Sequence, residues 1–311
     1  MNRNTPVKPV DLAVRVCGLR LKNPVIAASG TYGYGAEYRR LAPPADFGAI
    51  ITKTVTLAPR AGNPPPRVFE TASGMINAIG LANVGVEAFL RDKLPGLRRC
   101  GALVIANIAG NTADEYARLA RRLDGAPGIA AIEVNISCPN VRHGGVAFGT
   151  DPRVAASLTR KVKKAAKLPV IVKLSPNVSD IAAIARAVED AGADALSLIN
   201  TLYGMAIDSR RRRPVLGNVT GGLSGPAIKP VALYCVHQVC QAVKLPVIGI
   251  GGIRSAEDAA EFMLAGACAV QVGTATFADP GAARAIARGL AAYCREHGFG
   301  KASDITGALH K

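Results

Sequence analysis

The feature that most constrains the fold is a regular alternation of short apolar runs with longer amphipathic stretches. Each run is rich in Val, Ile and Ala, and near-continuous apolar runs of this length are typical of parallel strands that are buried on both faces. Eight such runs occur, at residues 24–30, 49–56, 103–110, 131–138, 169–176, 195–201, 246–253 and 269–275. The pattern therefore predicts an α/β fold with eight parallel strands.

The stretches between the runs have the apolar spacing of helices. This spacing is clearest at residues 113–123, 153–166, 181–191 and 256–265. Capping residues precede two of these segments, namely Asp180 and Ser255. About eight β–α repeats in 311 residues predict a TIM (β/α)8 barrel. A doubly wound sheet is the alternative, although it usually needs fewer repeats.

Three segments depart from the alternation. Residues 12–21 alternate in polarity around a glycine, which predicts a small N-terminal hairpin that covers the closed end of the barrel. Residues 57–85 and 202–225 are expected to be long βα-loop insertions, on the side where TIM barrels build their active sites. No linker divides the chain, so residues 1–311 are expected to form a single domain.

Cysteine usage and hydropathy narrow the class of protein. The seven cysteines include no C-x-x-C pair, which argues against a disulfide framework, a zinc site or an iron–sulfur cluster held by this chain alone. His143 has no His or Cys at ligand spacing, so no metal is expected. No apolar run reaches the length of a membrane helix, and no signal peptide is apparent. We therefore expect a cytoplasmic protein with no membrane partner.

The net charge of +16 raises the alternative of a non-catalytic nucleic-acid binder. Aromatic residues are only 5% of the chain and Trp is absent, which is poor provision for stacking on bases. Much of the positive charge falls on helix-like stretches, where a solvated face explains it. For the four arginines at 210–213, a solvated loop or a contact with an acidic partner subunit is preferred, so no nucleic-acid partner is expected.

Polar side chains gather at the carboxyl ends of the predicted strands. A buried amide or ammonium group costs free energy unless something pairs with it, so this gathering predicts a polar, partly anionic ligand across the barrel mouth. For any single Asn, an amide that ties down loop backbone is the alternative. The strand ends carry Ser29, Lys53, Thr54, Asn107, Asn135, Cys138, Lys173, Asn200, Thr201, Gly251, Gly252, Gly273 and Thr274.

Cys138 is the most informative of these residues. It lies between Ser137 and Pro139, just past a strongly apolar run, and Gly144 and Gly145 follow it. Because proline cannot extend a sheet, the chain must turn there, and a thiol at such a turn is placed for proton transfer or nucleophilic attack. A buried structural cysteine is the alternative.

The last two runs end in glycine ahead of a helix, at Gly251-Gly252 and at Gly273-Thr274. Glycine lets backbone N–H groups approach a phosphate, and TIM barrels commonly bind phosphate after strands seven and eight. Neither segment is a G-x-G-x-x-G fingerprint, and no P-loop is present. The glycines therefore favour the phosphate of a mononucleotide-type cofactor over NAD, with simple tight turns as the alternative.

Together these motifs resemble those of the class 1 dihydroorotate dehydrogenases, which are soluble flavin enzymes of pyrimidine synthesis. The resemblance spans nearly the whole chain after residue 10. Its segments are ASGTYG at 28–33, TKTVT at 52–56, NAIGLAN at 77–83, residues 134–145, VKLSP at 172–176, NT at 200–201, GGLSGP at 221–226 and the two glycine loops.

Subclass 1B is the nearer match. Cys138 stands where class 2 enzymes carry serine, and residues 141–149, 204–208 and 214–216 resemble class 1B more than the fumarate-using class 1A. The resemblance implies one FMN per chain, and a homodimer core joined into a heterotetramer by a second subunit. That subunit carries FAD and a [2Fe–2S] cluster and passes electrons to NAD⁺. A class 1A enzyme and a related dihydropyrimidine oxidoreductase are the alternatives.

The resemblance also implies the reaction and the residue roles. Dihydroorotate becomes orotate by losing a proton at C5 to Cys138 and a hydride at C6 to FMN. The residues implied to hold the substrate are Lys53, Asn77, Ala78, Ile79, Gly80, Leu81, Asn135, Asn200 and Thr201. Those implied to contact FMN are Ser29, Lys53, Thr54, Asn107, Asn135, Lys173, Ile199, Gly225, Gly251, Gly252, Gly273 and Thr274. Among them, Lys173 is expected near the flavin N1 and C2 carbonyl.

Overall fold

Eight parallel strands close into a barrel in the computed structural model, which describes residues 10–137, 142–143 and 146–310. Each strand is hydrogen-bonded to the next barrel strand along the chain, and the last returns to the first. Each strand overlaps one predicted run, so the TIM barrel prediction is confirmed. The strands are β3 (Val25–Ala27), β4 (Ala49–Ile51), β7 (Val104–Ile108), β8 (Ile129–Asn135), β11 (Val170–Lys173), β12 (Ala195–Leu198), β17 (Val247–Ile250) and β18 (Ala269–Val272).

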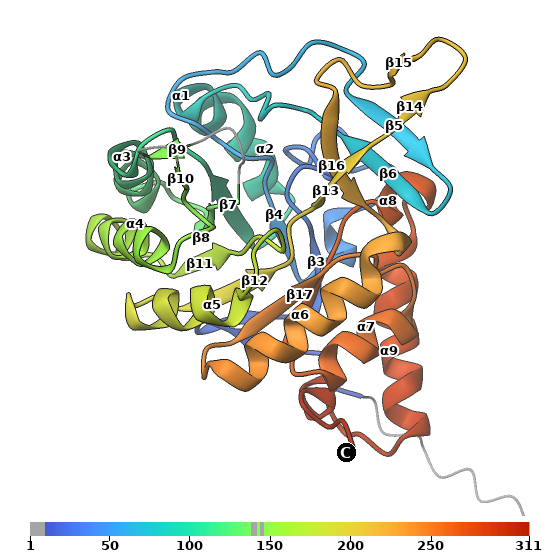
Figure 1. Cartoon of the computed structure of the whole chain (residues 1–311). Helices are drawn as coiled ribbons and strands as arrows, with labels where there is room; N and C mark the ends of the chain where they lie inside the picture. Colours follow the sequence, from blue (N-terminus) through green and yellow to red (C-terminus); the bar gives the residue numbers. More distant parts are fainter. Residues whose placement is uncertain (1–9, 138–141, 144–145, 311) are drawn as a thin grey trace, which may run out of the picture.

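Helices surround the barrel and cover the outer face of its strands (Figure 1). Four of them, α3, α4, α5 and α7, match the predicted helical segments to within one residue at either end. The α-helices are α1 (Val86–Ala88), α2 (Leu94–Arg99), α3 (Ala113–Asp124), α4 (Pro152–Ala165), α5 (Ile181–Asp190), α6 (Lys229–Ala242), α7 (Ala256–Leu264), α8 (Ala275–Ala278) and α9 (Ala282–Glu296). Other helical turns are η1 (Pro44–Asp46), η2 (Phe89–Lys93), η3 (Pro226–Ile228) and η4 (Ala302–Ile305).

The predicted helix starts are formed by side-chain caps. Asp180 accepts a hydrogen bond from the backbone N–H of Ala183 at 2.9 Å, and Ser255 forms a reciprocal capping box with Asp258. Each cap satisfies an N–H group that has no partner within its helix.

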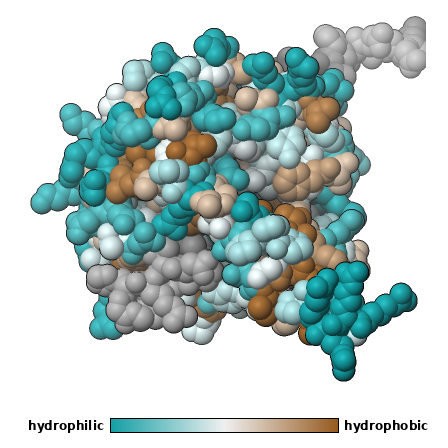
Figure 2. Space-filling view, turned by 90° about the horizontal axis from the view of Figure 1, so that it is seen from above, coloured by the Kyte–Doolittle hydropathy of each residue, from teal (hydrophilic) through white to brown (hydrophobic). Residues whose placement is uncertain are grey.

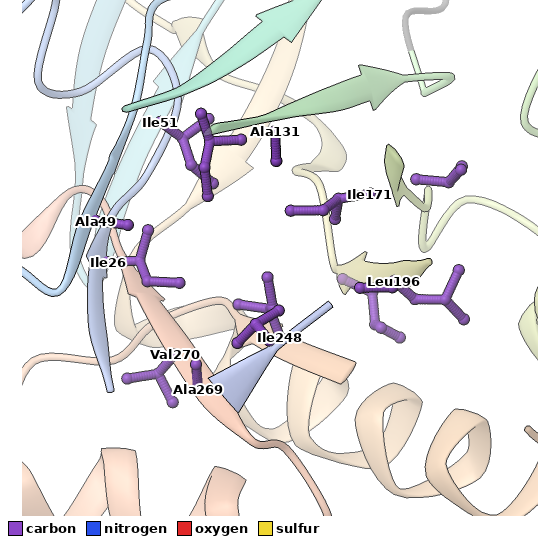
Figure 3. Packing of buried hydrophobic residues seen from close by; sticks show 14 of the residues in the cluster. Ile26, Ala49, Ile51, Ala131, Ile171, Leu196, Ile248, Ala269 and Val270 are labelled. Carbon is purple, nitrogen blue, oxygen red and sulfur yellow. The ribbon is translucent and has the colours of Figure 1, made fainter. Parts of the chain in front are cut away.

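Apolar side chains of the strands make up the core (Figure 3). Ile26, Ile171 and Ile248 come from three different strands and are fully buried. The closed barrel buries the inner face of each strand and the surrounding helices bury the outer face, which is why each strand reads as an almost unbroken apolar run.

The two predicted insertions come together as one antiparallel sheet, with the order β13-β16-β6-β5. The first insertion supplies β5 (Val68–Thr71) and β6 (Gly74–Asn77), and the second supplies β13 (Leu202–Met205) and β16 (Thr220–Ser224). This sheet, hereafter the mouth sheet, lies above the barrel in Figure 1. Two further hairpins are β9 (Arg142–His143) with β10 (Val146–Ala147), and β14 (Ile207–Asp208) with β15 (Arg213–Pro214).

The predicted N-terminal hairpin is formed by β1 (Val14–Val16) and β2 (Leu19–Leu21). Arg15 of this hairpin lines a small cavity together with Pro246 and Cys268, which immediately precede β17 and β18. The hairpin therefore lies at the amino end of the barrel, opposite the mouth sheet. None of the helices in the described part of the chain is long and apolar enough to cross a bilayer.

Candidate active site

A cavity of about 1570 Å³ lies between the carboxyl ends of the barrel strands and the mouth sheet. Most of the residues predicted to bind a ligand line this one cavity. They are Ser29, Lys53, Thr54, Asn77, Ala78, Ile79, Gly80, Leu81, Asn135, Lys173, Ile199, Asn200, Thr201, Gly225, Gly251, Gly252, Gly273 and Thr274. Parallel strands bring their carboxyl ends to one rim of a barrel, so residues far apart in the sequence meet there.

Two predicted site residues differ from the rest. Asn107 is fully buried within the barrel, behind the residues that line the cavity. Cys138 lies outside the described residues, although its neighbour Ser137 lines the cavity.

An amide cluster stands at the ends of β8 and β12. Asn135 accepts a hydrogen bond from the Ser137 hydroxyl at 2.8 Å, and Asn200 donates from its amide nitrogen to the same hydroxyl. The Asn200 carbonyl oxygen in turn accepts from the backbone N–H of Thr201 at 2.8 Å. These bonds fix the directions in which the amides face the cavity, which suits recognition of a planar polar ligand.

Two lysines place positive charge in the same cavity. Lys173 is the last residue of β11, is 6% exposed, and is in register with Asn135 of β8 and Ser197 of β12. Burial lowers the pKa of the Lys53 ammonium, nearby Arg67 acts in the same direction, and Glu37 opposes them. Ammonium groups that are largely removed from water favour an anionic ligand.

The glycine loops close one side of the cavity. Gly252 has a φ of +75°, and a Cβ placed on it would lie 2.9 Å from the carbonyl oxygen of Gly225. Only glycine fits that contact without strain. Arg254 follows on the same loop and also lines the cavity. Its backbone N–H donates to Asp258 at 2.9 Å, which ties the loop to the first turn of α7.

Several polar residues at or beneath the cavity were missed by the sequence argument. Asn177 lines the cavity and donates to the carbonyl oxygen of Thr201 at 3.0 Å. Its signal was an amide four residues beyond the end of β11, of the kind already noted at the other strands. Glu133 and Gln271 are buried inside strands, and their signal was a polar side chain within an apolar run.

Exposed surface around the mouth sheet is mixed in character. Seen from above, this face is largely hydrophilic and is interrupted by separate apolar areas (Figure 2). Arg210, Arg211 and Arg212 lie exposed in the turn between β14 and β15, and Arg211 approaches Asp208 at 3.7 Å. Within the described residues, no group of three or more His, Cys, Asp or Glu side chains could hold a metal ion.

Comparison with known proteins gives a consistent match over almost the whole chain. The family model for dihydroorotate dehydrogenase matches residues 11–293. A protein of Desulforudis audaxviator is 61% identical over 302 residues, which are 97% of this chain and 98% of that protein. One of Geobacter sp. strain M21 is 60% identical over 299 residues, or 96% and 98% of the two chains. Both relatives carry the name dihydroorotate dehydrogenase B (NAD(+)), catalytic subunit.

Proposed function

We propose that this chain, which belongs to the dihydroorotate dehydrogenase family, is the catalytic subunit of an NAD⁺-linked enzyme that oxidises dihydroorotate to orotate in pyrimidine biosynthesis. One structural observation carries the proposal. Side chains from the ends of the barrel strands and from both insertions line a single cavity, and they include amides, lysines and two glycine loops. At about 1570 Å³ the cavity exceeds the usual size of a site for one small ligand, as a site for both cofactor and substrate must.

The residues fit FMN as the cofactor. Ser29, Thr54, Ile199 and Gly225 would contact it along the wall of the cavity, and Gly251, Gly252, Gly273 and Thr274 would hold its phosphate. Gln271 lines the cavity, and its buried carbonyl oxygen has no hydrogen-bond partner in the described part of the chain, as expected where a ligand supplies the donor. When bound, the flavin ring supplies the hydride acceptor.

Lys173 and Lys53 would pair with different negative charges, one on the reduced flavin and one on the substrate. Lys173 would stabilise the negative charge that a flavin gains on reduction. Lys53 would pair with the carboxylate of dihydroorotate. The ring amides of the substrate would be held by Asn77, Asn135, Asn200 and Thr201, with backbone from residues 78–81. These contacts hold the substrate ring in one orientation, which aligns C6 for hydride transfer.

Cys138 would take the proton from C5 as a general base, so one proton and one hydride leave the substrate. The placement of Ser137 on the cavity wall supports this role for the next residue. A thiol is mostly protonated near neutral pH, so the two cavity lysines would assist by favouring the thiolate.

Electrons would leave through a partner. The relatives are named as catalytic subunits of NAD⁺-linked enzymes, and this chain has neither a dinucleotide fingerprint nor closely spaced cysteines. We therefore propose a homodimer core joined by a subunit that carries FAD and a [2Fe–2S] cluster. We also propose that residues 1–311 form one FMN-binding domain. The proposed location is the cytoplasm, where the free thiols of Cys235 and Cys294 stay reduced.

The experiment is anaerobic titration of the purified chain. Oxidised flavin absorption that dihydroorotate bleaches supports both cofactor and substrate. A colourless chain, or a flavin bleached only by dihydrouracil or dihydrothymine, contradicts the proposal. Recovery of the colour by fumarate alone would identify class 1A behaviour. Recovery by NAD⁺ only when the partner subunit is present supports the NAD⁺-linked enzyme.

A further inference from the structure

We propose that Glu133 is a positioning residue whose buried carboxylate turns the carbonyl oxygen of Gln271, on the cavity wall, toward the flavin and so keeps the flavin's reduction potential low. The inference rests on the proposed FMN function. Glu133 is not among the residues that the family resemblance implies. It lies on β8, is fully buried, and does not line the cavity.

Three donors from three other strands converge on this carboxylate. The amide nitrogen of Asn107, on β7, donates to its Oε1 at 2.7 Å. The hydroxyl of Ser197, on β12, and the amide nitrogen of Gln271, on β18, both donate to Oε2 at 2.8 Å. A side chain that accepts on both oxygens and donates on neither is an ionised carboxylate.

These bonds fix the orientation of both amides. An amide nitrogen can only donate, so each amide turns its nitrogen to Glu133 and its carbonyl oxygen away. The two oxygens, Asn107 Oδ1 and Gln271 Oε1, are buried and have no hydrogen-bond partner within the described residues. Gln271 itself lines the cavity. The carboxylate therefore fixes the orientation of an amide acceptor on a residue of the cavity wall, where a ligand can supply the donor.

Packing alone does not account for this arrangement. The interior of a TIM barrel is usually filled by Val, Ile and Leu, and apolar side chains of similar volume often replace a buried charge without loss of stability. A buried charge that leaves two acceptors unsatisfied costs free energy in the empty protein. Part of that cost is recovered where a ligand supplies a donor to Gln271, and the flavin ring carries one N–H group, at N3, that can do so.

The expected effect is on the reduction potential. Reduction adds negative charge to the flavin, and the nearby carboxylate of Glu133 and the carbonyl oxygen of Gln271 oppose that charge. In Glu133→Gln the charge is lost, and one oxygen becomes an NH₂ group that faces another amide donor. One of the two amides must then flip, and a flip of Gln271 turns its NH₂ toward the cavity. Both changes favour the reduced flavin, so the potential rises.

The test compares FMN-loaded wild type, E133Q and Ser197→Ala in the full chain by anaerobic redox titration. In E133Q, reduced flavin should gain at least about tenfold in affinity relative to oxidised flavin, a rise of about 30 mV for a two-electron couple. S197A loses a neutral donor but keeps the charge and both amides, so its potential should equal that of wild type. A folded E133Q with the wild-type potential overturns the inference, as does an equal shift in S197A.

A second variant covers the case in which E133Q does not fold. Gln271→Met is close to isosteric and removes the acceptor at the cavity wall. Its dissociation constant for FMN, measured by flavin fluorescence on adding FMN to the apo chain, should rise about tenfold, which is about 1.4 kcal/mol. An unchanged dissociation constant in Q271M overturns the inference. Wild-type chain that binds no FMN contradicts the proposed function instead.

Discussion

Gly222 of the mouth sheet stands directly against Thr201, three residues beyond the sixth barrel strand: a Cβ added to Gly222 would lie 2.6 Å from the Cβ of Thr201. Gly222 is also in register with Asn77 of β6. Asn77 lies in the first insertion, Gly222 lies in the second, and Thr201 follows a barrel strand. Asn77 and Thr201 are both proposed to hold the substrate. The mouth sheet thus sets the position of substrate residues through a contact that only glycine permits.

Gly222→Ala should therefore weaken substrate binding while FMN is retained. The added methyl group must displace Thr201, because no Cβ–Cβ contact can be that short. The KM for dihydroorotate should rise about tenfold, equivalent to about 1.4 kcal/mol, with a smaller change in kcat. Steady-state kinetics and the flavin absorption of the purified variant measure the two effects.

Gly96→Ala is the matched control. Gly96 lies in α2, and an added Cβ would meet no atom within 4 Å. Alanine in a helix should raise the unfolding free energy by about 0.5–1 kcal/mol and leave the KM unchanged. If G222A keeps the wild-type KM, the contact with Thr201 does not position the substrate.

Lys173→Met should lower the reduction potential of the bound flavin. Lys173 is 6% exposed at the end of β11, and a buried cation stabilises the charge added on reduction. A loss of about tenfold in relative affinity for reduced flavin corresponds to about 30 mV. Lys161→Met, which removes an exposed partner of Asp114, is the control and should leave the potential unchanged. If the flavin bound to K173M has the wild-type reduction potential, Lys173 does not stabilise the reduced flavin.

The barrel was predictable from the sequence because each strand is short, apolar and buried on both faces. Caps such as Asp180 and Ser255 fixed the helix starts locally, without any information from distant residues. The gathering of site residues followed from topology, since parallel strands place their carboxyl ends on one rim. The resemblance to a known family then supplied the roles.

The mouth sheet was not predictable in the same way. Its pairing joins Asn77 to Gly222, 145 residues further along the chain, and loop composition carries no long-range register. The Glu133 network was missed for a similar reason. A charged residue within an apolar run was visible, but its donors Asn107 and Gln271 lie on strands whose inward positions only the closed barrel defines.

Asp258→Asn should destabilise the protein in a pH-dependent manner. Burial raises the pKa of the Asp258 carboxyl, but hydrogen bonds from Lys229 and the backbone of Arg254 and Ser255 outweigh it, so the pKa lies below its usual value. The resulting stability is present above the unfolded pKa of about 3.9 and is lost as pH falls through the folded value. The variant should therefore lose about 1–2 kcal/mol at neutral pH, and the difference should shrink in acid.

Denaturant unfolding of D258N and wild type across this pH range measures the difference. Glu261→Gln is the control, because Glu261 contacts the same Lys229 ammonium at 3.0 Å but is far more exposed. It should change stability by less than about 1 kcal/mol. A loss in D258N that stays constant into acid would show that the charge of Asp258 does not carry the effect.

Cys138→Ser should retain FMN but slow its reduction by dihydroorotate about 10²-fold or more, because an unactivated hydroxyl is a far weaker base than a thiolate. Stopped-flow absorption under anaerobic conditions measures the step directly. In wild type the rate should rise with pH as the thiol ionises, and in the variant this rise should disappear.

Cys100→Ser is the matched control, since Cys100 does not line the cavity and its thiol donates to the Gly96 carbonyl oxygen at 3.3 Å. It should reduce at the wild-type rate with the wild-type pH profile. Equal reduction rates in C138S and C100S would exclude Cys138 as the base and leave proton removal to another group at the cavity.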